Sequence, residues 1–105
     1  MVKLAYKVKI TVLRRFDPSE VFKEPPMPRI QPSVACSRNK DGQEFIVGED
    51  GKISEGFCPG AWVSIYPSIT LLRFGGDLPQ FKEKGVDIQS CTDGLRPVIF
   101  KLERI

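Results

Sequence analysis

The chain has 105 residues, of which 41% are hydrophobic and 28% charged, a composition typical of one folded domain and unlike that of a disordered chain. It contains no histidine, which excludes a Ser-His-Asp triad, a Cys-His pair and zinc sites with imidazole ligands. The net charge of +3 is too small to indicate a nucleic-acid partner by itself, and no apolar run approaches the ~20 residues of a membrane span.

The first segment alternates between apolar and polar side chains. The even positions of residues 2–12 are all apolar, whereas the odd positions include three lysines. This period of two predicts a long strand over residues 2–13 whose even positions are buried. Residues 1–15 carry five basic and no acidic groups, which suits a phosphate backbone but also protects an exposed strand edge. A basic patch with interleaved aromatic residues is missing, so we expect no nucleic-acid partner.

A short helix and a proline-rich segment follow. Asp17 is a typical N-cap residue, Pro18 suits the first helical position, and Glu20 is placed to complete a capping box. This helix can last only a turn or two, because residues 24–35 contain four prolines in twelve positions. We expect residues 24–35 to form an extended arm that covers part of the domain.

Two turns predict two short strands in the next part of the chain. Residues 43–47 predict a strand that begins after the Asp41-Gly42 turn. Residues 49–52 predict a second turn, and a short partner strand is expected around Ile53.

The period then changes to that of a helix. Across residues 58–72, apolar side chains recur at spacings of four and three, which predicts one buried helix face. Pro59 suits the first helical position, and two glycines after residue 74 predict the helix end. Because Pro67 cannot continue a straight helix, we expect two helical pieces, roughly 59–66 and 67–74, that meet at a kink.

The C-terminal part predicts two further strands. Residues 86–91 and 97–105 are expected to form them, joined by a turn at residues 92–95. The whole pattern predicts an α+β fold: a single small domain over residues 1–105, with a mainly antiparallel sheet of about five strands and a central kinked helical segment. The first and last strands are expected to lie near each other in the sheet.

The cysteines are the most informative residues for function. Three cysteines cannot all pair within one chain, and the first residues contain no apolar signal-peptide region. We therefore expect a cytoplasmic protein with reduced thiols that serve as packing residues, metal ligands or reactive groups. Cys58 is expected at or just before a helix N-terminus, where free N–H groups and the helix dipole favour the thiolate. Because Cys58 also heads the apolar stripe, a packing role stays open.

Other candidate site residues lie around the second cysteine. Cys91 is expected at the end of a strand, where a turn exposes a side chain that the sheet holds rigid. Asp93 and Arg96 supply a carboxylate and a cation, although both residue types also suit a solvated turn. Trp62 and Arg96 are candidate ligand-contacting residues, and core packing also explains Trp62. Cys36, at the end of the arm, has a position that favours no particular role.

The spacing of the cysteines is weak evidence for a metal site. There is no C-x-x-C pair, and the three thiols are separated by 22 and 33 positions. If the fold brought Cys36, Cys58 and Cys91 together, a metal would still need a fourth ligand from water, Asp or another subunit. Zinc, iron or Cu(I) are the soft metals that such a site would select.

Three stretches resemble known motifs: residues 56–62 (GFCPGAW), 72–76 (LRFGG) and 91–105 (CTDGLRPVIFKLERI). They resemble a family of small uncharacterised proteins from bacteria and archaea, frequently anaerobes, and the likeness extends over most of the chain. A fourth, less specific stretch from Cys36 through Gly42 to Phe45 resembles the Cys-x5-Gly-x-x-Phe pattern of the same family. The resemblance implies no established activity, but it implies that all three cysteine positions belong to recurring motifs. The chain departs from the family at Gly60, where a larger side chain is expected.

Two functional hypotheses remain. In the first, Cys58, Cys91 and Asp93 form a site, closed by Cys36, that acts as a nucleophile or redox pair on a small molecule or holds a soft metal. In the second, the protein is a non-enzymatic homo-oligomeric or accessory domain whose cysteines are packing residues. An oligomer is expected in either case, because the arm and the last strand carry apolar side chains that need a partner surface.

Overall fold

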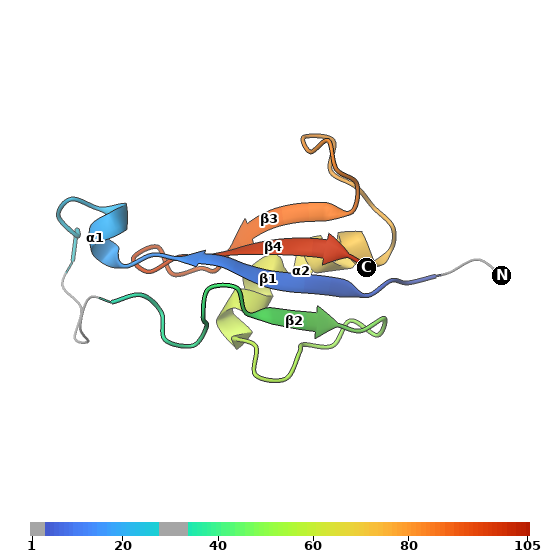
Figure 1. Cartoon of the computed structure of the whole chain (residues 1–105), viewed down its shortest axis with the longest axis horizontal. Helices are drawn as coiled ribbons and strands as arrows, with labels where there is room; N and C mark the ends of the chain where they lie inside the picture. The colour runs from blue at the N-terminus through green and yellow to red at the C-terminus, as the bar shows by residue number, and fades with distance from the viewer. Residues whose placement is uncertain (1–3, 28–33) are drawn as a thin grey trace.

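A four-stranded sheet with one long helix behind it forms the body of the molecule (Figure 1). The computed structural model describes residues 4–27 and 34–105. The strands lie in the order β2-β1-β4-β3, and each neighbouring pair is antiparallel. The elements are β1 (Val8–Arg15), α1 (Pro18–Val21), β2 (Glu44–Val47), α2 (Pro59–Arg73), β3 (Val86–Ser90) and β4 (Val98–Arg104). The α+β fold with an antiparallel sheet is confirmed, and the first and last strands pair directly, as predicted.

The hydrophobic core lies between α2 and one face of the sheet. Strands β1, β2 and β4 contribute alternate residues, because successive side chains of a strand point to opposite faces. Helix α2 packs against β1, β3 and β4. The buried apolar residues are Val8, Ile10, Val12, Phe45, Val47, Phe57, Ala61, Ile65, Ile69, Leu72, Val98, Phe100 and Leu102. This packing holds the helix, including its N-terminus, in a fixed position against the sheet.

The predicted register of the first strand is confirmed at its centre and wrong at its ends. Val8, Ile10 and Val12 are fully buried, but Leu4 is 82% exposed and position 2 lies outside the described residues. Backbone pairing of β1 with its neighbours begins only at Val8, which lies opposite Val47 at the end of β2 and opposite Arg104 at the end of β4. Among residues 4–7, single backbone contacts take the place of ladder pairs: the Tyr6 N–H donates to the Arg73 carbonyl at 2.8 Å, and the Ile105 N–H donates to the Lys7 carbonyl at 2.9 Å. At the other end, the strand continues to Arg15 through a register shift after Val12.

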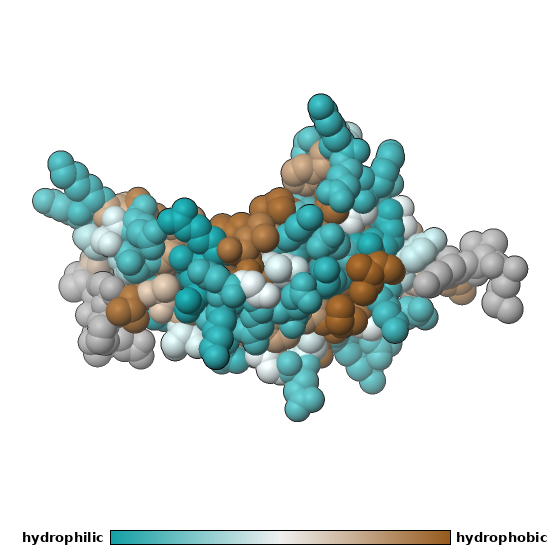
Figure 2. Space-filling view, viewed as in Figure 1, coloured by the Kyte–Doolittle hydropathy of each residue, from teal (hydrophilic) through white to brown (hydrophobic). Residues whose placement is uncertain are grey.

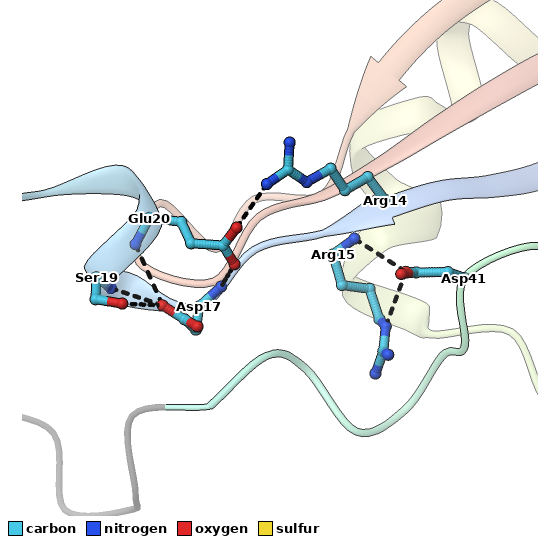
Figure 3. Close-up of polar contacts among 6 residues, drawn as sticks. All are labelled: Arg14, Arg15, Asp17, Ser19, Glu20 and Asp41. Carbon is cyan, nitrogen blue, oxygen red and sulfur yellow. Dashed lines mark hydrogen bonds and ion pairs between the residues drawn. The ribbon is translucent and has the colours of Figure 1, made fainter.

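The short helix α1 begins as the sequence predicts. The Asp17 carboxylate accepts hydrogen bonds from the N–H groups of Ser19 and Glu20, and the Asp17 N–H donates to the Glu20 carboxylate (Figure 3). This reciprocal capping box satisfies donors that the first helical turn leaves without a partner. The helix ends at Val21, before the prolines of the arm. The arm's residues 28–33 lie outside the described residues.

The prediction of a fifth strand around Ile53 is wrong. Residues 51–57 form no strand, and Ile53 is 42% exposed. This segment meets β2 through a side chain, because the Ser54 hydroxyl donates to the Ile46 carbonyl at 2.7 Å. A hydroxyl contact of this kind satisfies one carbonyl without starting a ladder of backbone hydrogen bonds.

The prediction of two helical pieces is also wrong, because α2 is one continuous helix that includes Pro67. Proline removes the donor that would reach the carbonyl four residues earlier, that of Val63. Val63 is 73% exposed and Pro67 is exposed too, so the missing hydrogen bond lies on the solvent side of the helix. Gly75 then ends the helix with φ +86°, a conformation that favours glycine, and its N–H donates to the Leu72 carbonyl.

The face of the sheet opposite α2 carries charged side chains of both signs. Lys9 on β1 lies 3.6 Å from Glu44 on β2 and 3.8 Å from Glu103 on β4. Figure 2 shows hydrophilic side chains over much of this face, with smaller apolar patches between them. Lys9, one of the basic residues of the first segment, is therefore paired with carboxylates. Neither helix in the described parts of the chain is long and apolar enough to cross a membrane.

Candidate cysteine pocket

Three separate parts of the chain meet at one end of the sheet and form a pocket of about 200 Å³. They are residues 36–39, the first turn of α2, and the loop from Cys91 to β4. Cys36, Cys58 and Cys91 each lie in one of these parts and line the pocket. All three are free cysteines, half-buried rather than fully enclosed, and packed against the edge of the core.

Cys58 is the N-cap residue of α2, the position expected from the sequence. Its extended backbone (φ −66°, ψ 120°) and the following Pro59 start the helix, and its carbonyl accepts from the Trp62 N–H at 2.9 Å. The Cys58 side chain caps no N–H group of the first turn. The N–H groups of Gly60 and Ala61, the usual partners of an N-cap side chain, are therefore left beside the pocket without that acceptor.

Gly60 keeps the space beside the Cys58 thiol open. A β-carbon at position 60 would lie 3.9 Å from Cys58 Sγ, and Gly60 itself lines the pocket. A larger side chain at this position would extend into the same space. Glycine at this position therefore leaves room for a ligand beside the Cys58 thiol.

Cys91 is fixed by the backbone of β4. Its N–H donates to the Val98 carbonyl at 3.0 Å, and its sulfur accepts from the Val98 N–H at 3.3 Å. The pair continues the β3–β4 ladder by one residue beyond Ser90. The sheet therefore determines the position of Cys91, as the sequence indicates, and the chain turns away immediately after it.

Cys36 is brought to the pocket by Arg15 at the end of β1. The Arg15 guanidinium donates to the Cys36 carbonyl at 3.0 Å, and both the Arg15 side chain and its backbone N–H donate to Asp41 (Figure 3). These contacts join residues 36–41 to the sheet, although 21 positions separate Arg15 from Cys36. No local sequence pattern predicts them.

Asp93 and Arg96 shape the loop between β3 and β4. Asp93 Oδ1 accepts from the N–H groups of Leu95 and Arg96, at 2.9 and 3.0 Å. Its other oxygen lies 3.7 Å from Arg96 Nε. The Arg96 side chain is 16% exposed and also donates to the Val34 carbonyl at 3.4 Å. The Asp93 carboxylate therefore holds a turn and an arginine in place.

Two pocket residues, Arg38 and Asn39, are not predicted by the sequence patterns. Asn39 is 3% exposed, and its Oδ1 is buried with no hydrogen-bond partner in the described part of the chain. Arg38 is exposed and makes no ion pair within residues 4–27 and 34–105. Their only signal is that they follow Cys36 by two and three residues, a position that any polar loop would share.

Trp62 is the one predicted ligand-contacting residue that does not line the pocket in the described structure. Its ring lies 6.1 Å from that of Phe57 and 5.5 Å from that of Tyr66, at the edge of the core. Among the described residues, no group of three or more Cys, Asp or Glu side chains is arranged to hold a metal ion. The three thiols share a pocket without forming a metal-ligand cluster.

No protein-family model, no curated protein and no solved structure matches this chain. The resemblance to a family of small bacterial and archaeal proteins therefore stays a prediction.

Proposed function

We propose that this protein binds a small molecule in the pocket and that the Cys58 thiol reacts with it as a nucleophile. The observation that carries the proposal is the meeting of three half-buried thiols around one pocket. Fully buried cysteines are the usual packing residues, whereas half-buried thiols beside an opening are accessible to a ligand. A volume of about 200 Å³ is smaller than the ~300–1,000 Å³ of clefts for drug-sized ligands, which suits a small metabolite.

Attack of the Cys58 sulfur on an electrophilic atom of the ligand is the reaction that these residues support. The thiol proton passes to solvent, a sulfur lone pair forms the new bond, and the leaving group departs with the electron pair of the bond that breaks. Cys58 supplies the sulfur at a helix N-terminus, an environment that stabilises negative charge. Arg96, held by Asp93, supplies a fixed cation that also lines the pocket.

A packing role for the cysteines is the second candidate function. It is favoured by the contacts of all three with the hydrophobic core. In that case the protein acts through its surface, as an oligomeric or accessory domain, and the pocket is a packing defect between three segments. The two candidates differ in the reactivity of Cys58.

Competitive alkylation distinguishes them. The folded protein is treated with a limiting amount of iodoacetamide, unfolded, labelled with an isotopic form of the same reagent and mapped by peptide. We expect Cys58 to be alkylated first in the folded protein, and all three cysteines to react at similar rates in urea. Slow alkylation of Cys58 together with ordinary alkylation of Cys36 supports the packing role instead.

A matched pair of glycine variants links the reactivity to the pocket. Gly60→Leu fills the space beside Cys58 Sγ, and we expect it to slow alkylation of Cys58. Gly94→Ala adds a methyl group in the neighbouring loop, where the added β-carbon meets no described atom within 4 Å apart from the adjacent residues, and we expect no change. Equal alkylation of Cys58 in Gly60→Leu and in the unaltered protein places the reaction outside the pocket and contradicts the proposal.

A further inference from the structure

The geometry points to a small carboxylate as the ligand class of this pocket, with its anionic end on the arginine side and its reactive end at Cys58. This inference rests on the proposed function and specifies the substrate of that site. Three independent features of the described residues carry it: the charge of the walls, the helix N-terminus and a buried amide without a partner.

The charged side chains around the pocket are predominantly basic. Arg38 and Arg96 line it, against the single carboxylate of Asp93, which leaves two positive charges and one negative. Asp93 Oδ1 is occupied by two backbone N–H groups, so this carboxylate is already used in the turn. The sheet face opposite α2 differs, because Lys9 there lies between two glutamates. The side chains that line the pocket therefore carry a net positive charge, whereas the lysine on the sheet face is neutralised by carboxylates.

The first turn of α2 adds to this positive field. Its N–H groups carry partial positive charge, and the Cys58 side chain accepts none of them. Gly60 and Ala61 both line the pocket, and glycine lets a ligand approach the backbone closely. An anion bound between this turn and Arg96 would lie next to the thiol, because Cys58 is the residue that starts the turn.

The third and independent observation is the buried side chain of Asn39. It lines the pocket, its side chain is almost fully enclosed, and no described residue donates to its Oδ1. A buried acceptor without a donor is costly, and native proteins rarely keep one. The N–H or O–H of a ligand supplies the missing donor after a small rearrangement of the amide. The pocket therefore suits a hydroxy- or amino-substituted carboxylate of a few heavy atoms.

Two alkylating reagents of similar size, one negatively charged and one neutral, test the inference. Iodoacetate carries a carboxylate and iodoacetamide a neutral amide, and both replace iodide by the Cys58 sulfur. The measured quantity is the iodoacetate-to-iodoacetamide rate ratio at Cys58, in the folded protein and in urea. We expect the ratio to be several-fold higher in the folded protein and to decrease as NaCl is raised, because salt screens the arginines.

Charge variants identify the source of the preference. Arg38→Gln changes an exposed residue, so the fold is retained, and we expect the ratio to decrease by about two- to fivefold. Arg96→Gln should lower it further, whereas Lys82→Gln, an equal change of charge in the loop before β3, should leave it unchanged. Protection of Cys58 by lactate but not by lactamide provides a second, non-covalent readout.

The outcomes separate the two proposals. If Cys58 reacts rapidly with both reagents but the ratio is the same in folded and unfolded protein, the carboxylate inference is wrong and the thiol site stands. If Cys58 reacts slowly with both, the proposed function is wrong, and this inference is overturned with it. A high ratio that Lys82→Gln lowers as much as Arg38→Gln reflects only net charge and also overturns it.

Discussion

Replacing Ile10 by Asp tests the packing on which the pocket depends. Ile10 is fully buried at the centre of β1, with Phe45 opposite it on β2 and Leu102 opposite it on β4. Removing an isoleucine side chain from such a position costs about 2–5 kcal/mol of unfolding free energy. An unpaired carboxylate in the same place costs several kcal/mol more. The total is comparable with the ~5–15 kcal/mol that stabilises a typical domain, so we expect Ile10→Asp to be unfolded.

Urea titration followed by tryptophan fluorescence measures this effect, because Trp62 is the single tryptophan and is half-buried beside Phe57. Ile10→Val should retain a cooperative transition with a loss of about 1 kcal/mol. Lys7→Asp, at an exposed position just before the strand, should leave the transition nearly unchanged. A cooperative transition of Ile10→Asp near that of the unaltered protein would refute the register of β1 and the core built on it.

Two other predictions concern pH and association. A hydrogen bond from Arg104, followed by one from the Gly85 N–H, holds the pKa of Asp77 below its ordinary value of 3.8. The ionised carboxylate therefore stabilises the fold above about pH 4, and this contribution disappears as the pH falls through the lowered pKa. Urea titrations between pH 2 and 5 measure it: in Asp77→Asn, the free energy of unfolding should lose the part of its pH dependence that Asp77 causes. Met27 and Val34, on either side of the undescribed part of the arm, are 60% and 54% exposed, and we expect the arm to pack against a second copy. Light scattering at low micromolar concentration should give a mass above 11.8 kDa, and deletion of residues 24–34 should lower it; a mass of one chain contradicts this prediction.

The sheet is readable from the sequence where one pattern dominates. Alternation through Val8, Ile10 and Val12 and again through Val98, Phe100 and Leu102 predicts both central strands, because each has one buried face. The break expected at Pro67 does not occur, since the local rule for proline ignores that this residue lies on the solvent side of a helix held by the core. The extent of β1 is set by where its partner strands end, which alternation cannot reveal.

The candidate site can be predicted from the sequence only in part. Pro59 after Cys58 indicates a helix start, and the turn after Cys91 indicates a strand end, so the local surroundings of both thiols follow from the sequence. Their meeting with Cys36 does not follow, because it depends on the contacts of Arg15 with residues 36–41. Asn39 gives no specific signal beyond its closeness to Cys36 in the sequence, since its burial results from packing between distant segments.

The proposed site is one pocket that binds a small carboxylate beside the Cys58 thiol. A crystal structure of the folded protein after reaction with one equivalent of iodoacetate tests it most directly. We predict a carboxymethyl group on Cys58 Sγ, with its carboxylate within hydrogen-bond distance of the Arg96 or Arg38 guanidinium or of the first N–H groups of α2. Modification of Cys36 or Cys91 with Cys58 unreacted, or a carboxymethyl group that points into solvent away from both arginines, would contradict the claim.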